Sequence, residues 1–419
     1  MFDLDSWQEV WFTITKNKMR SLMTAFGVFW GIFMLVVMLG AGTALENGIF
    51  NGVKGFASNS YFMFSGRTTV PYKGFRKGRV WELKIDDIEI LKRKIDGIKY
   101  ITPMVFGQGG SNNIVRKDKY GSFSTLGTGS NYILINPMTF LYGRYINDLD
   151  VLEKRKVCTI GSKVYNDLFN KGEDPEGALI KISGIYYTVV GVVEPLSDNF
   201  NFGGPAEEMI YIPYTLAQQT NQMGNEIHSI GITLDDNLPM SENEERIKSI
   251  VKANHQIAPD DVQAVNGFNV QKLFQTFMSL TLGIKILIWI VGLGTLLAGV
   301  VGVSNIMLVT IKERTQEIGI RRALGAKPSQ IIVQIMSESL VLTSIAGIVG
   351  ICCGVGLLSL VSSLLEANPT ENTFFLNPQI SFVVAIVSLF VLIICGMIAG
   401  LLPSYRAMQI KAIDALRDE

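Results

Sequence analysis

The chain alternates between long apolar runs and a single long polar region. Ser21–Leu45 contains no charged residue, and it is long enough to cross a hydrocarbon layer of about 30 Å. Three further apolar runs lie in the last third of the chain. The pattern predicts four transmembrane helices, over 21–45, 271–311 (with a stalk at its start), 331–365 and 380–402.

The polar region, residues 46–270, shows alternating helical and strand patterns. Asp86 and Asp87 can cap a helix whose inner face carries Ile88, Leu91 and Ile95. Apolar residues alternate with polar ones in the strand candidates. The other predicted elements are strand Lys156–Ile160, helix Ser162–Phe169, hairpin Leu179–Ile182 with Tyr186–Val193, strand Glu208–Pro213 and helix Asn243–Ala253. The fold class is therefore an α-helical membrane protein with a mixed α+β domain inserted between its first two spans.

Charge is distributed by position along this pattern. Residues 312–330 carry five Lys or Arg against two Glu, whereas the short connection 366–379 carries two Glu and no basic residue. Short basic loops stay on the cytoplasmic side, so we expect both termini inside. Residues 1–20 predict a cytoplasmic amphipathic helix, although a targeting segment is an alternative reading. Residues 403–419 form the cytoplasmic tail, and 46–270 lie outside.

Composition excludes several functions. The 419 residues have a net charge of zero, so no global basic field points to nucleic acid. Cys158 is alone in the polar region, and neither His228 nor His255 has a partner at ligand spacing. The dipeptide Gly-Lys does not occur, so the phosphate-binding loop G-x-x-x-x-G-K-[ST] is absent from this sequence. We expect no catalytic residue, cofactor or metal in this chain.

The basic loop itself has an ordered pattern. Ile320, Ala323 and Leu324 recur at helical spacing, and Glu317 precedes Arg321 by four residues. Gly325 and Pro328 are suited to end this helix and begin the next. A loop that served only as a basic topology signal would need neither an amphipathic helix nor residues that cap it. The pattern therefore favours an amphipathic helix that docks on a cytoplasmic protein.

This loop, KERTQEIGIRRALGAKPSQI, precedes an apolar segment with an early Glu338, and it resembles the ABC-transporter permeases of the MacB/FtsX type. In that family the element is the coupling helix that seats on the ATPase subunit. The resemblance assigns this role to Arg314, Glu317, Ile318, Ile320, Arg321, Arg322, Ala323, Leu324, Gly325 and Lys327.

The resemblance extends along the chain, because the family also has one span, a large outer domain and three further spans. The series GRYIND…KVCTIG…GALIKISGIYYTVVGVVEP…EMIYIPYTLAQ is similar to the MacB-type periplasmic core domain. In the family this domain has two lobes, one inserted in the other. We place the insertion at about residues 115–205.

The spans contain small residues four apart and almost no charge. Small residues let helices approach closely in lipid, so we expect helix packing at these positions. Glu338 lies close to the start of the third span. We expect it to form an ion pair with a basic loop residue at the membrane interface; a proton-carrying role is the alternative. The predicted packing residues are Gly294, Ala298, Gly302, Ala346, Gly350 and Gly354.

The resemblance implies the permease subunit of a bacterial ABC transporter that works by mechanotransmission in the inner (plasma) membrane. ATP and Mg²⁺ would bind a separate cytoplasmic ABC ATPase subunit, because the sequence begins six residues before Trp7 whereas full-length MacB has its ATPase domain there. A second copy or a homologous permease, a periplasmic adaptor, an outer-membrane channel and membrane lipid would be its other partners. The outer domain would drive export or efflux from the outer face. The alternatives are an FtsX-like regulator of a cell-wall hydrolase and a lipoprotein-releasing permease.

Overall fold

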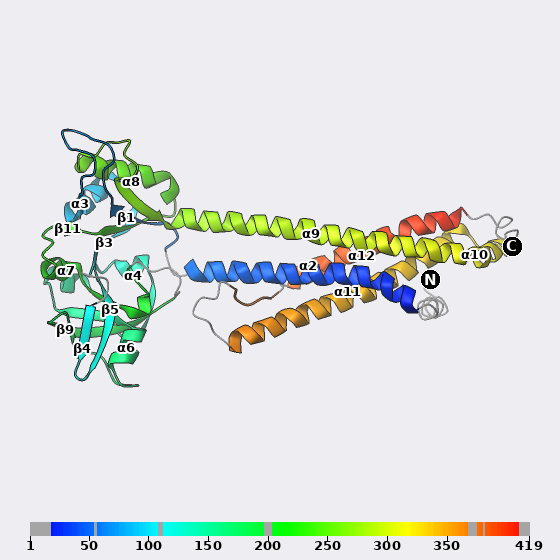
Figure 1. Cartoon of the computed structure of the whole chain (residues 1–419), viewed down its shortest axis with the longest axis horizontal. Coiled ribbons are helices and arrows are strands. Elements are labelled where there is room, and N and C mark those ends of the chain that lie inside the picture. Colours follow the sequence, from blue (N-terminus) through cyan, green and yellow to red (C-terminus); the bar gives the residue numbers. More distant parts are fainter. Residues whose placement is uncertain are drawn as a thin grey trace. The chain divides into compact units, whose positions relative to one another are not determined.

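The computed structural model divides the chain into two compact units, which we describe separately (Figure 1). The helical unit comprises Met1–Ile49 with Ser279–Glu419, and the outer unit comprises Phe50–Met278. Most of the amphipathic helix predicted over 1–20 lies outside the described residues. The structure describes residues 18–53, 57–107, 112–196, 203–367, 375–379 and 382–409.

Among the described residues, four helices are long and apolar enough to cross a membrane. Their lengths follow from the uninterrupted apolar runs, since a helix satisfies all its backbone hydrogen bonds internally in lipid. The prediction of four spans and a mixed α+β domain is confirmed. The long helices are α2 (Lys18–Val53), α9 (Val270–Glu313), α11 (Pro328–Ala367) and α12 (Phe382–Met408), and the short helix α10 is Thr315–Ala323.

Glycine allows the spans of the helical unit to approach closely. A Cβ at Gly299 of α9 would lie 3.0 Å from the carbonyl oxygen of Gly27 in α2. A Cβ at Gly350 of α11 would lie 2.9 Å from the carbonyl oxygen of Phe29 in α2. These distances are shorter than ordinary van der Waals contacts, so larger residues would separate α2 from both neighbours.

Helices α11 and α12 pack through small and hydroxylic side chains. A Cβ at Gly396 would meet Thr343 at 2.4 Å, and the Ser339 hydroxyl donates to the Gly396 carbonyl at 3.2 Å. Both Ser339 and Thr343 are buried. A hydrogen bond to a buried carbonyl thus accompanies close packing at this helix pair.

One set of predicted packing positions makes no close contact with the described residues of this chain, and packing at these positions stays a prediction. Gly294 and Gly302 have no atom of the described residues within 4 Å of an added Cβ, and Ala298 is exposed. Gly299, one residue further along, packs on α2 instead. A shift of one residue rotates a helical position by about 100°. The face of α9 that carries Gly294, Ala298 and Gly302 is therefore turned away from α2.

The outer unit is built on an 11-stranded sheet. Its main order is β10-β7-β9-β8-β4-β5-β3-β12-β1-β13, with β6 paired to β9, and β2 pairs separately with β11. The strands are β1 (Ser60–Ser65), β2 (Leu83–Lys84), β3 (Ile98–Phe106), β4 (Asn112–Arg116), β5 (Lys119–Thr128), β6 (Met138–Gly143), β7 (Val157–Gly161), β8 (Leu179–Ile182), β9 (Ile185–Pro195), β10 (Met209–Pro213), β11 (Glu226–Ile227), β12 (Ser229–Leu234) and β13 (Val265–Asn269).

Part of this sheet closes on itself. Strand β10 pairs antiparallel with β7 and parallel with β5, so β5, β10, β7, β9, β8 and β4 form a closed circuit. The remaining strands β3, β12, β1 and β13 continue from β5. Because β3 pairs with β5, the closed circuit and the remaining strands belong to one sheet. The division of the domain into two lobes therefore stays a prediction.

Short helices cover the outer sheet, and several match the sequence pattern. Helix α3 (Ile85–Lys94) buries Ile88 and Leu91, and the Asp87 carboxylate accepts from the Lys84 N–H at 2.8 Å. The predicted hairpin, the strand near residue 210 and the helix near residue 248 are also confirmed. The other helices are α4 (Tyr132–Ile135), α5 (Asp148–Leu152), α6 (Ser162–Leu168), η1 (Ala206–Glu208), α7 (Tyr214–Thr220) and α8 (Met240–Asn254).

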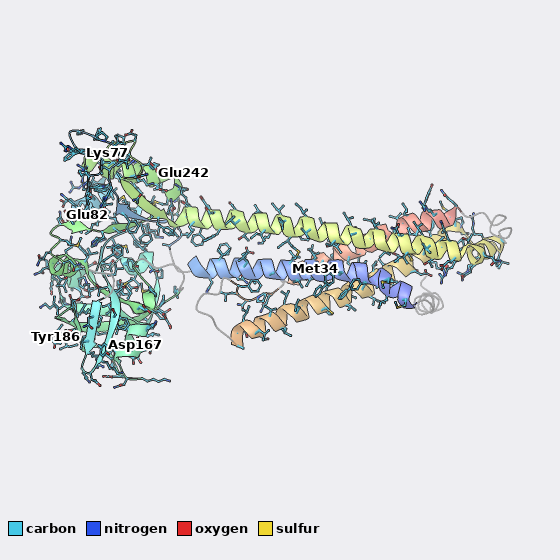
Figure 2. The ribbon with its side chains drawn as sticks, in the orientation of Figure 1. Met34, Lys77, Glu82, Asp167, Tyr186 and Glu242 are labelled. Carbon is cyan, nitrogen blue, oxygen red and sulfur yellow. The ribbon has the colours of Figure 1, made fainter. Side chains whose placement is uncertain are left out.

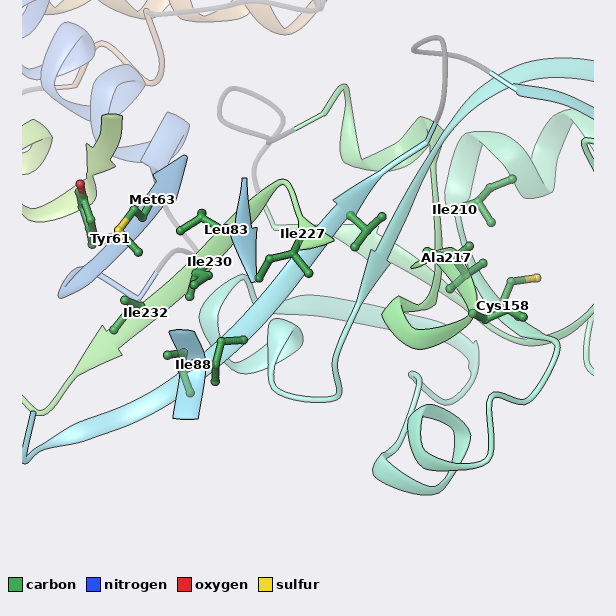
Figure 3. Packing of buried hydrophobic residues seen from close by; sticks show 14 of the residues in the cluster. Tyr61, Met63, Leu83, Ile88, Cys158, Ile210, Ala217, Ile227, Ile230 and Ile232 are labelled. Carbon is green, nitrogen blue, oxygen red and sulfur yellow. The ribbon is translucent and has the colours of Figure 1, made fainter. Parts of the chain in front are cut away.

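Cys158 lies in the core of the outer unit. Its side chain is fully buried in a cluster that also contains Ile210 and Ala217 (Figure 3). Burial raises the pKa of this thiol above its ordinary value, because the thiolate would lose its solvation. The residue is a free cysteine, so it packs as a small apolar side chain.

We expect the Cys158 thiol to resist alkylation in the native protein and to react when the chain unfolds. The test is maleimide labelling of a variant in which Cys352, Cys353 and Cys395 are replaced by Ala. Asn225→Cys, added at an exposed position, is the control that shows how fast an accessible cysteine reacts with the maleimide. Equal native labelling rates for Cys158 and the added cysteine would show that the core opens readily.

Candidate coupling site

The basic loop forms a short helix between two long ones. Helix α9 ends at Glu313, and Arg314 leaves helical geometry with φ −97° and ψ 13° before α10 begins. Gly325 then adopts φ +98°, a conformation that glycine adopts without a Cβ clash. Helix α11 follows from Pro328, where the Lys327 N–H donates to Gln330 Oε1 at 3.0 Å.

One face of α10 packs inward. Ile318 and Gly319 are its buried residues. Ile318 belongs to the apolar cluster of the helical unit, together with Ile311 of α9 and Ile331 and Ile335 of α11. Burial of this face places α10 against the ends of both long helices, so α10 has a fixed orientation relative to them.

An ion pair reinforces this arrangement. Glu338 of α11 is 5% exposed, and Arg314 donates to its carboxylate at 3.2 Å. The two residues border a small cavity of about 30 Å³. A buried carboxylate is stable when it is paired with a cation. The structure thus pairs Glu338 with a basic loop residue, and its position at the membrane interface stays a prediction.

Two further arginines connect α10 to its neighbours. Arg321 donates to Gln334 of α11 at 3.0 Å and to Glu317 at 2.8 Å. Arg322 donates to the main-chain carbonyl of Met408 in α12 at 2.9 Å. These contacts hold α10 in place, a role that the sequence did not distinguish from contact with a partner.

The opposite face of α10, together with its C-terminal cap residue Leu324, carries exposed apolar side chains. Ile320 is 44% exposed and Leu324 is 83% exposed, and Ala323 is also exposed. We call these three residues the outward trio. The predicted coupling residues therefore fall into two groups. Ile318, Arg314, Arg321 and Arg322 contact the neighbouring helices, whereas the outward trio is exposed. Docking of the outward trio on a partner stays a prediction.

The other end of α9 is held within the outer unit, and sequence reasoning missed these contacts. Asn269 Oδ1 accepts from the Lys272 N–H at 3.1 Å, which caps the first turn of α9. Gln271 Oε1 accepts from the Ser241 N–H of α8 at 2.8 Å. Glu244 of α8 is 5% exposed and accepts from Lys272 Nζ at 2.6 Å.

Glu244 has two further donors. Asn269 Nδ2 donates to its carboxylate at 2.9 Å and Lys248 Nζ at 2.5 Å. Burial alone would raise the pKa of Glu244, but the hydrogen bonds from Lys248, Lys272 and Asn269 outweigh it and lower the pKa to about 2. The only signal in the sequence was the i,i+4 spacing of Glu244 and Lys248, which does not reveal the link to α9.

Comparisons with known proteins match both units. A family described as MacB-like periplasmic core domain matches residues 21–250, and FtsX-like permease C-terminal matches residues 272–412. The chain is 27% identical over 97% of its length to a protein of Bdellovibrio bacteriovorus and 30% identical over 97% of its length to one of Neisseria meningitidis. Both relatives are named macrolide export ATP-binding/permease protein MacB, and the chain spans 60% of the length of each.

A solved structure also matches part of the chain. It is the periplasmic region of MacB from Actinobacillus actinomycetemcomitans, with 21% identity and a TM-score of 0.43. The match covers 55% of this chain and 97% of that one.

We expect Glu244→Gln to destabilise the outer unit at neutral pH and to make its stability less sensitive to acid. The pKa of Glu244 falls from its ordinary 4.5 to about 2 on folding. Its stabilisation is therefore fully present above about pH 4.5 and is lost as the pH falls through 2.

Thermal unfolding of the full chain in detergent, followed over this pH range, tests the prediction. The Tm difference between wild type and Glu244→Gln should shrink as the pH falls. Glu173, whose pKa Arg116 also lowers to about 2, titrates in both proteins and cancels in the difference. A Tm difference that does not change with pH would contradict the assignment.

Proposed function

The chain belongs to the family of permeases with a MacB-like periplasmic core domain and an FtsX-like C-terminal part, and we propose that it is the permease subunit of a bacterial ABC exporter that works by mechanotransmission. The observation that carries this proposal is the outward trio, an exposed apolar face on a helix whose other face is fixed by buried contacts. The names of the relatives support export as the direction of transport.

The outward trio supplies a docking surface for a cytoplasmic ABC ATPase, which we place on a separate subunit that binds ATP and Mg²⁺. Leu324 and Ile320 are large apolar side chains, and their exposure to water is unfavourable. Lys327 is exposed beside them, at a position suited to an interface rim. Central apolar residues contribute most of the energy of such an interface, and rim charges mainly tune encounter.

Motion of the ATPase reaches the outer domain through α9. The helix is continuous from Val270 to Glu313, a length of roughly 65 Å at 1.5 Å per residue. At one end Arg314 follows it and pairs with Glu338, and at the other end Lys272 pairs with Glu244. A shift of α10 would therefore move α9 and the α8 segment together, and the substrate would leave from the outer face of the inner membrane.

A second permease copy would pack on the stripe formed by Gly294, Ala298 and Gly302. These small residues face away from the described residues of this chain. Leu293 and Leu297 are exposed on the same side of α9. Small residues at four-residue spacing with flanking apolar side chains are typical of close helix pairs in lipid.

We expect Leu324→Asp to weaken ATPase binding by about 2 kcal/mol or more, roughly 30-fold in affinity. The substitution places an unpaired carboxylate in the centre of the proposed interface. Binding of the purified ATPase to the permease in nanodiscs measures the change. Leu152→Asp in the outer domain, where Leu152 is 77% exposed, is the matched control.

The permease carrying Leu324→Asp should still insert, and its outer domain should still unfold cooperatively. Arg321→Ala should reduce ATPase binding less, because Arg321 bonds to Gln334 of α11 and lies outside the outward trio. Wild-type affinity for the ATPase in the Leu324→Asp variant would contradict the docking role of α10 and, with it, coupling through this helix.

We expect Ala298→Cys to form an intermolecular disulfide on mild oxidation in membranes, in a background without the native cysteines. Ile348→Cys, at an exposed position of α11, is the control and should give several-fold less dimer. Cross-linking through Ile348→Cys instead of Ala298→Cys would place the second copy on another face.

A further inference from the structure

The outer unit carries a strongly basic hairpin that the proposed export function does not use. The segment Gly66–Trp81 contains five basic residues and no acidic residue. The whole chain has 37 basic and 37 acidic residues, so the rest of the chain has a net charge of −5 (32 minus 37). The basic residues of this hairpin are Arg67, Lys73, Arg76, Lys77 and Arg79.

Backbone contacts hold the tip of the basic hairpin in one conformation. Tyr72 and Phe75 exchange two main-chain hydrogen bonds, of 3.1 and 2.9 Å. Between them Lys73 and Gly74 have φ values of +43° and +87°, as in the two-residue turns of β-hairpins. The cationic side chains therefore stand on an ordered turn.

A buried carboxylate fixes the base of the hairpin. Asp261 is fully buried and accepts from the Thr69 N–H at 2.6 Å, the Thr69 hydroxyl at 2.7 Å and the Val70 N–H at 3.1 Å. Trp81 closes the other side, where its indole N–H donates to the Ala264 carbonyl at 3.0 Å. The hairpin is thus anchored to the segment that leads into β13.

Two of the five cations contact aromatic rings of the hairpin, and one of these two also donates a hydrogen bond. Lys73 Nζ lies 5.5 Å from the Tyr72 ring centre. Arg79 donates to the His255 carbonyl at 2.6 Å, and its guanidinium lies 4.1 Å from the Phe75 ring centre. The four side chains other than Arg79 are exposed and form no salt bridge with any residue that the structure describes. Figure 2 shows one of them, Lys77, at the margin of the outer unit.

The position of the hairpin and the side chains between its charges favour a protein as its partner. Strand β13 runs from Val265 to Asn269 and leads directly into α9, whereas the hairpin begins next to Ser65, which pairs with Val265. The hairpin therefore follows the strand end opposite to the start of α9, the helix that enters the membrane. Phe75 and Val80, 43% and 62% exposed, place apolar area between the charges, and protein interfaces are enriched in such aromatic and Arg residues.

We propose that the basic hairpin is a docking site for an acidic surface of a partner protein on the outer side of the membrane. The four exposed cations, Arg67, Lys73, Arg76 and Lys77, steer and orient the partner, and Phe75 and Val80 supply apolar contact. Because the backbone is already ordered, binding loses little conformational entropy. This inference does not depend on ATPase coupling.

The test uses the full chain in phosphatidylcholine nanodiscs with fluorescent poly-L-glutamate as the acidic polypeptide probe. Lys73→Gln, Arg76→Gln and Lys77→Gln are combined in one variant. The matched control combines Lys92→Gln, Arg93→Gln and Lys94→Gln at the exposed end of α3, with the same loss of three charges. We expect binding to weaken by about tenfold in the hairpin variant and by much less in the control.

Equal loss in both variants would show a general charge effect and would overturn the assignment, as would no loss in the hairpin variant. Flotation with phosphatidylglycerol vesicles separates the lipid alternative. Vesicle binding that needs the hairpin, combined with no binding of poly-L-glutamate, would assign the site to anionic headgroups and overturn a protein partner. The ATPase affinity of the hairpin variant should equal that of wild type.

Discussion

The pairing of a buried carboxylate, Glu338, with Arg314 helps to fix the position of α10 between α9 and α11. Glu338 is buried, and an isolated charge at a buried position would be strongly unfavourable. Its bond to Arg314 joins the non-helical residue after α9 to α11. Ile318 lies in the apolar cluster, and Leu324 is left on the outside. The ion pair and the burial of Ile318 together fix which face of α10 points outward.

The same chemistry occurs where α9 begins. Glu244 is as buried as Glu338 and is bonded to Lys272 in the first turn of the helix. Removing either partner of such a pair costs more than the pair contributes, because the remaining charge stays buried. The two ends of one helix are therefore fixed by interactions that are expensive to break, while the helix between them needs only apolar contact.

The sequence predicted the spans and the amphipathic helix of the loop because both depend on local periodicity. It did not predict which small residues of α9 face α2, since Gly299 and Gly294 differ by a rotation about the helix axis that spacing alone leaves undetermined. It also grouped Ile318 with Leu324, although tertiary packing separates them. The bond between Glu244 and Lys272 joins segments 28 residues apart, and no pattern in a single sequence identifies such a pair.

The closed circuit of strands in the outer unit has a mechanical consequence. Each of the strands β5, β10, β7, β9, β8 and β4 has hydrogen-bonded neighbours on both sides, so none of them can slide without breaking a ladder of bonds elsewhere in the ring. Such a body is stiff to shear, and it can respond to a pull from a neighbouring segment only by turning as a whole. Closure also leaves these six strands without a free edge, the usual template for aggregation.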